Sequence, residues 1–253
     1  MTNFSRLFCT TSLLTLTAAL LLPGSAAAQH GYLFQSPVAN LSLRLGVGGP
    51  SAPSNDPFFG ILTDTLSVKA KDLRGTSFSA DLGIAASSRF EVVLGFARDA
   101  TTNPSEYKNW LDENDKPIRQ TTDIQRMPLT LGAKYYLVPR GRNLSKHAWI
   151  PSSFTPYVTA GGGAMFYKIY QTGEWIDVES PTHDIFGSTF QSSGTGFTGH
   201  VGGGASWWFN PHLGLTADAR YAWGTAKLHG DFSELDRVDL RGFQITTGLA
   251  VQF

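Results

Sequence analysis

Eight separate stretches of this chain alternate between apolar and polar residues, and this pattern constrains the fold more than any other feature. The last stretch, residues 242–253, is the clearest, because one parity holds Phe243, Ile245, Thr247, Leu249, Val251 and Phe253. The other parity holds only Gly, Gln, Thr and Ala. A period of two is typical of a β-strand whose two faces meet different surroundings. The sequence therefore predicts an all-β protein.

The connections between the predicted strands alternate in length. The strands are expected at residues 39–48, 76–85, 90–97, 126–138, 154–169, 196–209, 213–223 and 242–253. The first, third, fifth and seventh connections are long, the second and sixth are tight, and the fourth spans 139–153. In an antiparallel up-and-down barrel this pattern collects the long loops at one end. Segments 62–70 and 188–196 are expected to extend hairpins there rather than to add strands to the ring. The triple glycine of the fifth strand does not determine which of its two faces points outward, and it is compatible with a β-bulge.

The first 28 residues are predicted to be a secretory signal, so the folded domain is expected to span residues 29–253. A single basic residue, Arg6, precedes an apolar run that ends at a Pro-Gly pair and three alanines. The alternative is a membrane-spanning helix, for which the continuous apolar run is too short. The one cysteine, Cys9, lies in this segment, so the mature domain is expected to contain no disulfide.

The contents of the two strand faces decide between a soluble and a membrane barrel. The polar faces are rich in Gly, Ser and Thr, and only 16% of the chain is charged. The exterior of a soluble barrel usually carries more Lys and Glu than this. The apolar faces have aromatic residues near the strand ends, as expected for two membrane girdles. We therefore predict an eight-stranded antiparallel up-and-down transmembrane β-barrel in a Gram-negative outer membrane.

Six charged residues then face the lumen, three of each sign: Arg44, Lys134 and Arg220 with Asp81, Glu91 and Asp218. Burying an unpaired charge costs several kcal/mol. We therefore expect these side chains to pair and to plug the interior, since an eight-stranded barrel is only wide enough to be filled by side chains. This arrangement would exclude a wide aqueous channel.

Several segments resemble small outer-membrane barrels of the OmpW, OmpX and OmpA-transmembrane type. They are the terminal strand ending in Phe253, "MPLTLGAKYYLV", "TPYVTAGGGA" and "LGLTADARYAW". The resemblance covers nearly all of the mature chain and concerns architecture rather than activity. It implies that the barrel assembly machinery recognises Leu249, Val251 and Phe253. It also implies contact with outer-membrane lipid and lipopolysaccharide.

Motifs that would indicate enzymatic or cofactor chemistry are few. His200 is the one histidine expected inside the barrel. It could act as a base with Ser206 or a neighbouring carboxylate, but no G-x-S-x-G motif accompanies it, and a hydrogen-bonded lumen histidine is favoured. The glycine-rich segments lack a Gly-Lys-Ser/Thr sequence, and no histidines have metal-ligand spacing. The formal net charge of zero gives no reason to expect nucleic acid. We expect no catalysis, no cofactor and no metal.

The leading functional hypothesis is a non-enzymatic surface barrel with structural or interaction roles carried by its long extracellular loops. The alternative is a narrow conduit for small or hydrophobic molecules, of the kind that the resemblance to OmpW implies. A lipid-modifying enzyme centred on His200 is a third and weaker hypothesis.

Overall fold

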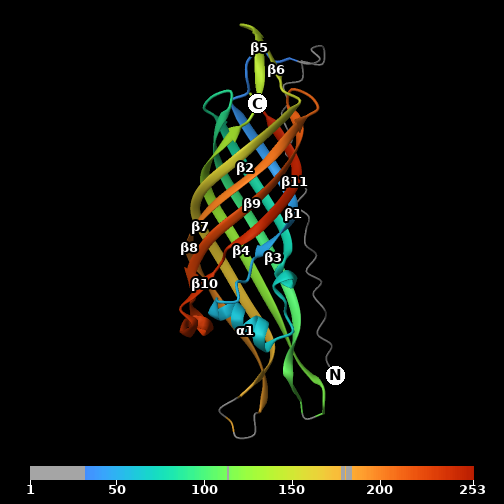
Figure 1. Ribbon diagram of the computed structural model, residues 1–253, viewed down its shortest axis with the longest axis vertical. Helices are drawn as coiled ribbons and strands as arrows, with labels where there is room; N and C mark the ends of the chain where they lie inside the picture. The colour runs from blue at the N-terminus through green and yellow to red at the C-terminus, as the bar shows by residue number, and fades with distance from the viewer. Residues whose placement is uncertain (1–31, 113, 178–179, 181–183) are drawn as a thin grey trace, which may run out of the picture. The chain divides into compact units, whose positions relative to one another are not determined.

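The computed structural model describes residues 32–112, 114–177, 180 and 184–253, so the expected signal segment lies outside the described residues. Within these ranges, eight antiparallel strands form a closed ring in chain order (Figure 1). They are β1 (Ala39–Pro50), β2 (Gly75–Ala85), β3 (Phe90–Leu111), β4 (Pro117–Tyr136), β7 (Phe154–Ile176), β8 (Ile185–Trp208), β9 (Leu213–Lys227) and β11 (Gly242–Gln252). The ring closes between the first and last strands, where Asn40 pairs with Gln252 and Pro50 with Gly242. The chain is an eight-stranded up-and-down β-barrel, as its alternation predicts.

Smaller elements decorate the two ends of the barrel (Figure 1). The fourth connection folds into a hairpin, β5 (Gly141–Ser145) with β6 (Ala148–Pro151), at the end where the C-terminus lies. The other end carries helix α1 (Pro57–Thr65), the short 3-10 helices η1 (Ala70–Leu73) and η2 (Gly230–Leu235), and β10 (Arg237–Asp239), which pairs with β9. The expectation that segment 62–70 extends a hairpin is wrong, because its first four residues complete α1.

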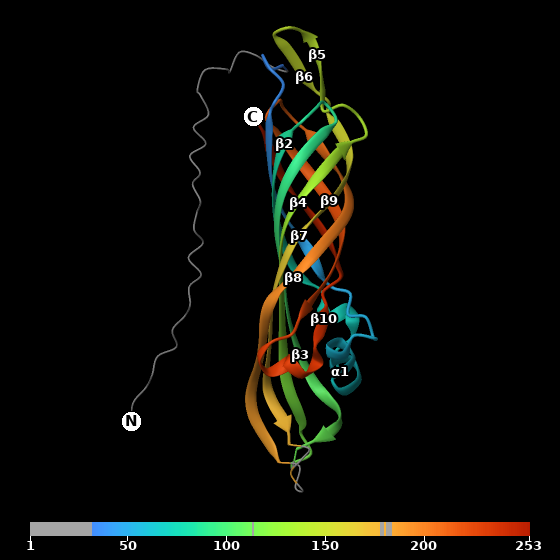
Figure 2. The same ribbon diagram turned by 90° about the vertical axis from the view of Figure 1, so that its left-hand side faces the viewer.

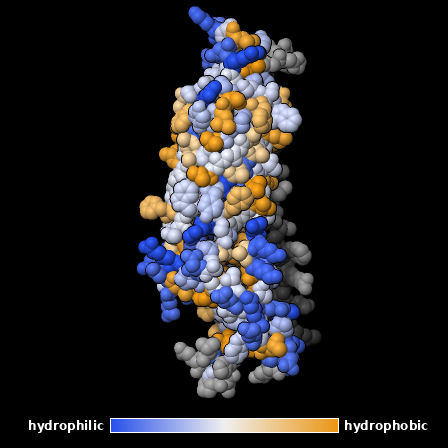
Figure 3. Space-filling model, viewed as in Figure 1, coloured by the Kyte–Doolittle hydropathy of each residue, from blue (hydrophilic) through white to orange (hydrophobic). Residues whose placement is uncertain are grey.

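The exterior of the barrel is apolar over the part where the alternation was recognised (Figure 3). Outward side chains such as Leu45, Leu131 and Phe197 are exposed by 67%, 62% and 90%. A contiguous exposed apolar surface of this kind is not tolerated in water but matches the hydrocarbon core of a bilayer. The barrel is therefore a transmembrane barrel of the outer-membrane type, whose long connections lie on the extracellular side. Among the described residues, no helix is both long enough and apolar enough to cross a bilayer.

The β3–β4 and β7–β8 hairpins continue well beyond the apolar band and form an extracellular extension (Figure 2). Residues 99–125 and 170–195 were expected to be connections, and this is wrong over most of their length. The strands run to Leu111 and Ile176 before they turn. Segment 188–196 lies within β8 and extends its hairpin. The glycine-rich part of β7 keeps its register from Tyr157 to Ala164 without a bulge.

In the extension the two strand faces change their character: the outer face becomes polar, and the inner face mixes apolar residues with buried polar ones such as Asn103 and Thr122. Ile118, Ile124 and Ile169 point inward and are fully buried, whereas outward positions carry polar residues such as Thr102. The first extracellular loop folds against this inner surface. Phe58, Phe59 and Leu62 of α1 pack in one apolar cluster with strand residues Tyr167, Ile169 and Val238 and with Leu228 and Leu240 of the adjoining segments. The part of the barrel beyond the membrane is thus built like a water-soluble domain, with a hydrophobic core inside.

Helix α1 is short and depends on its N-cap. Asp56 precedes Pro57, whose fixed φ suits the first helical position. The Asp56 Oδ1 atom accepts a hydrogen bond from the Phe59 amide at 3.0 Å, and Oδ2 accepts one from the Asp239 amide at 2.6 Å. One carboxylate therefore caps the helix and joins it to β10.

Candidate functional site

The middle of the lumen is filled by a network of four charged side chains from β1, β2 and β9. The Arg44 Nη2 atom lies 2.7 Å from the Asp81 Oδ2 atom, and the Arg220 guanidinium contacts the same carboxylate. The Arg220 Nε atom lies 2.6 Å from the Asp218 Oδ1 atom. Tyr157 donates a hydrogen bond to the other Asp218 oxygen at 3.0 Å. The side chains of Arg44, Asp81 and Asp218 are 0–1% exposed, so these ion pairs are shielded from water.

A second charged group lies nearer the periplasmic end and is centred on Glu91. Lys134 places its Nζ atom 4.0 Å from Glu91 Oε2, and Tyr136 donates a hydrogen bond to the same oxygen at 2.9 Å. Arg140 completes this group, with its Nη1 atom 3.0 Å from Glu91 Oε1 and Nη2 donating to the Pro37 carbonyl. Sequence reasoning missed Arg140, because it lies in the fourth connection, outside the predicted strands.

A third charged group lies on the extracellular side of the central network. The Arg126 Nη2 atom lies 2.6 Å from the Asp99 Oδ2 atom, and Gln244 donates to the other oxygen at 3.3 Å. Arg126 also donates to the Leu240 carbonyl at 2.7 Å, which links the lumen to the chain segment between β10 and β11. This pair was missed because Asp99 was taken as the first residue of a loop. Val93 and Ala97 point inward, and the next inward position of the same alternation is Asp99, so a longer predicted strand would have included it.

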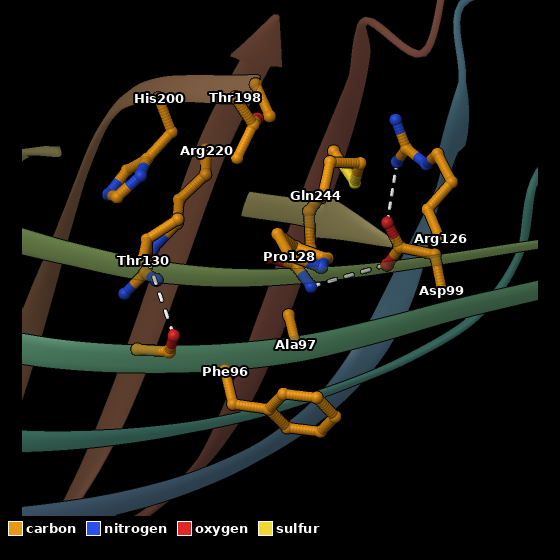
Figure 4. A pocket seen from close by; sticks show the side chains of 13 residues that line it. Phe96, Ala97, Asp99, Arg126, Pro128, Thr130, Thr198, His200, Arg220 and Gln244 are labelled. Carbon is orange, nitrogen blue, oxygen red and sulfur yellow. Dashed lines mark hydrogen bonds and ion pairs between the residues drawn. The ribbon is translucent and has the colours of Figure 1, made fainter. Parts of the chain in front are cut away.

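A small cavity separates the central and extracellular charged groups (Figure 4). It measures about 30 Å³, and Figure 4 shows His200 and Arg220 on one side and Asp99, Arg126 and Gln244 on the other. A water molecule occupies roughly this volume in the liquid. His200 lies in the lumen and is buried, but it does not meet Ser206. The two residues are six positions apart on β8 and therefore about 20 Å apart along the strand. Ser206 instead lies 3.4 Å from the Thr216 hydroxyl.

The three residues of the predicted assembly signal lie on the lipid-facing side of the last strand. Leu249 and Phe253 are largely exposed, and Val251 is partly exposed. The carbonyl of Phe253 accepts hydrogen bonds from the amides of Val38 and Ala39, each at 2.9 Å. The last residue of the chain therefore takes part in closing the ring. Among the described residues, no group of three or more His, Cys, Asp or Glu side chains is arranged to hold a metal ion.

The extracellular extension contains a second cavity, which the sequence did not indicate. It measures about 180 Å³ and lies between α1, η2 and the inner surface of the long hairpins. Most of its lining is apolar: Phe58, Ile61, Leu62, Leu66, Trp175, Phe232 and Leu235. Its polar atoms come from Tyr107 and from Gln120 and Gln171, whose side chains share a hydrogen bond of 2.8 Å. Partial burial raises the pKa of the Tyr107 hydroxyl, so this group stays neutral and can donate a hydrogen bond.

No protein-family model and no curated protein matches this sequence. Solved structures of outer-membrane proteins are similar to it at low identity. The outer membrane protein OprG from Pseudomonas aeruginosa is 15% identical with a TM-score of 0.44, and the match covers 87% of this chain and 99% of that chain. Neisserial surface protein A is 13% identical with a TM-score of 0.41, over 85% and 97% of the two chains. The outer membrane protease OmpT from Escherichia coli is 9% identical with a TM-score of 0.41, over 90% and 100%. At these values the similarity transfers no activity, substrate or partner to this chain.

Proposed function

We propose that the protein is a non-enzymatic outer-membrane barrel that acts at the cell surface and does not conduct solutes through its lumen. The observation that carries this proposal is the position of Asp81, a buried carboxylate of β2 that is held both by Arg44 of the neighbouring β1 and by Arg220 of β9. An ion crossing the barrel would have to separate these charges and those of the groups above and below them. Breaking one buried ion pair costs about 3–5 kcal/mol, which opposes an open pathway.

The extracellular extension supports a role in surface interaction. Its two long hairpins have a packed apolar core, so they present their outer side chains on a rigid support rather than on mobile loops. The distance between His200 and Ser206 argues against a lipid-modifying enzyme that would use these two residues together. The proposal includes two partners: the barrel assembly machinery, through Leu249, Val251 and Phe253, and outer-membrane lipid with lipopolysaccharide around the apolar band.

Planar-bilayer recording tests the closed lumen. The purified barrel is expected to give no discrete openings, whereas the double variant Asp81→Ala with Arg220→Ala, which removes the centre of the network, is expected to give small ones. Lys168→Ala, on the outer face, is the matched control and should behave as the wild type. Discrete wild-type openings whose conductance changes in Asp81→Ala would contradict the proposal and favour a conduit.

A second candidate function, favoured by the extracellular cavity, is the capture of a small hydrophobic molecule, as expected of an OmpW-like protein. A dry apolar cavity of about 150 Å³ is known to bind benzene, and the cavity next to α1 measures about 180 Å³. Fluorobenzene binding, followed by fluorine NMR in detergent micelles, tests this. Ile61→Trp should fill the cavity and abolish binding, whereas Ile61→Val should preserve it. Equal binding by the wild type and Ile61→Trp would eliminate this candidate.

A further inference from the structure

The outer surface of β8, β9 and β10 carries a pair of like charges that the barrel itself does not explain. Arg237 of β10 is paired directly opposite Lys227 of β9, and both side chains are exposed on the outer face. Like charges in directly opposite positions destabilise a strand pair. Within the described part of the chain, neither side chain forms an ion pair. Their neighbour Arg241 does, because its Nε atom donates to Asp239 Oδ2 at 2.5 Å. Asp239 lies on the same face of β10 but is held by Arg241, so among the described residues of this surface Lys227 and Arg237 are two cations without a carboxylate partner.

An aromatic groove lies on the membrane side of these two cations. It measures about 520 Å³ and is lined by Phe197, Gly199, Tyr221, Trp223 and the ion pair of Asp239 with Arg241, among others. Phe197 is 90% exposed, so no other part of the protein packs on it. Gly199 makes room for the groove wall, because a Cβ atom there would lie 2.7 Å from the Trp223 ring. A volume of this size falls in the range of small-molecule binding sites, about 300–1,000 Å³.

The strand geometry places the groove and the cation pair at two different depths of the membrane. Trp223 belongs to the outward aromatic residues that mark a membrane interface. Lys227 lies four residues further along β9 on the same face. This separation is about 13 Å along the strand and about 10 Å along the membrane normal at a typical tilt. The headgroup layer extends roughly 5–8 Å beyond the hydrocarbon core, so a long basic side chain at Lys227 reaches it. Hydrophilic side chains gather around β10 at this edge of the apolar band (Figure 3).

We propose that this surface is a binding site for one phosphorylated lipid of the outer leaflet, an inference that rests on the proposed contact of the barrel with lipopolysaccharide. The phosphate would lie between Lys227 and Arg237, and an acyl chain would occupy the groove beside Phe197 and Trp223. A soluble anion alone would leave the groove unused. A second copy of this chain related by a twofold axis would bring the same cations together and be repelled. An amphipathic molecule with an anionic head satisfies both parts of the surface.

The test measures lipid retention by the purified barrel in a non-ionic detergent, using native mass spectrometry. The probes are diphosphoryl lipid A and the same lipid with both phosphates removed. The wild type is expected to retain one molecule of the phosphorylated lipid and to bind the dephosphorylated form at least tenfold more weakly. The double variant Lys227→Ala with Arg237→Ala should lose at least tenfold in affinity for the phosphorylated lipid, and Phe197→Ala should lose part of it.

Lys168→Ala is the matched control, because Lys168 is an exposed cation just beyond the apolar band on β7. It is expected to retain the lipid as the wild type does. An equal loss in this control would show diffuse attraction to the whole rim and overturn the proposal. Complete displacement of the lipid by millimolar inorganic phosphate would also overturn it, since the site would then hold a free anion.

A second readout separates binding from a structural role of the two cations. In lipid-free detergent, Lys227→Ala should unfold at the same temperature as the wild type or a higher one, because it removes the repulsion from Arg237. Added lipid A should then stabilise the wild type more than this variant. A lower unfolding temperature of the lipid-free variant would mean that Lys227 serves the fold, and the proposal would fail.

Discussion

Replacement of Asp81 by alanine is the sharpest perturbation of the barrel interior. Asp81 neutralises Arg44 at 2.7 Å and also contacts Arg220. Without it, Arg220 keeps Asp218 at 2.6 Å, whereas Arg44 keeps only neutral hydroxyl groups such as that of Ser79 at 3.2 Å. Arg44 would then be a fully buried charge without a counter-ion. Removing one partner of a buried ion pair costs about 3–5 kcal/mol, and we expect the free energy of unfolding to fall by this amount.

Urea unfolding in detergent micelles, followed by gel mobility and tryptophan fluorescence, measures this loss. Thr246→Ala is the matched control, because the uncharged Thr246 hydroxyl accepts a hydrogen bond from the same guanidinium at 3.3 Å. Its loss should be about 1.5 kcal/mol, the low end for a hydrogen bond to a charged group, because Arg44 keeps its counter-ion. Adding Arg44→Met to Asp81→Ala removes the isolated charge and should recover about 1–3 kcal/mol, because contacting residues are energetically coupled. A loss below about 1 kcal/mol in Asp81→Ala, or a double variant whose loss equals the sum of the single ones, would refute the reasoning.

Three further predictions concern the loop, the strands and the terminus. Asp56→Ala should lower the local stability of helix α1 by about 1–2 kcal/mol, because it removes the N-cap hydrogen bond from the Phe59 amide. Faster proteolysis within the first extracellular loop, at an unchanged stability of the barrel, would reveal this loss. Gly132→Val should reduce the yield of folded barrel on mobility gels, because a Cβ atom there would lie 2.5 Å from the Ala160 carbonyl oxygen. The control Gly187→Ala should fold normally, because a Cβ atom at that position meets nothing within 4 Å. Phe253→Ala should slow incorporation into the outer membrane of cells while the purified, refolded barrel keeps its mobility, and unchanged incorporation would argue against a role of this residue in assembly.

The ring and the facing of its membrane-spanning strands could be predicted from the sequence, because each strand carries both faces and the bilayer requires them to differ. Tyr136 and Lys134 belong to the polar parity of "MPLTLGAKYYLV" and are buried inside, whereas Leu129 and Leu131 belong to the apolar parity and are exposed. The alternation is a local signal, so the facing of each strand can be assigned without knowing which strands are neighbours.

The extracellular extension could not be predicted in the same way, because its outer face is polar and its inner face is only partly apolar. Ile124 and Ile169 place apolar residues on the inward side, so a parity count that runs through the whole strand cancels and the segment resembles a loop. The missed pair of Arg126 and Asp99 lies where this change of the faces begins. Arg140 was missed for a different reason, since its contact with Glu91 depends on how the fourth connection folds back over the barrel end.

The change of the two faces follows from the two solvents that surround the strands. Where lipid surrounds the barrel, the apolar side chains of the outer face are already shielded from water. The interior therefore need not be apolar, and it can hold charged groups such as Arg44 with Asp81, provided that they are paired. Where water surrounds it, burial of apolar side chains is the force that holds the strands together, so the interior must become apolar. Helix α1 supplies the missing half of that core with Phe59 and Leu62, because the two hairpins are joined through β4 and β7 into one sheet that cannot cover its own inner face. The first extracellular loop is therefore a structural part of the extension, and loosening it should expose the apolar cavity without disturbing the charged interior below.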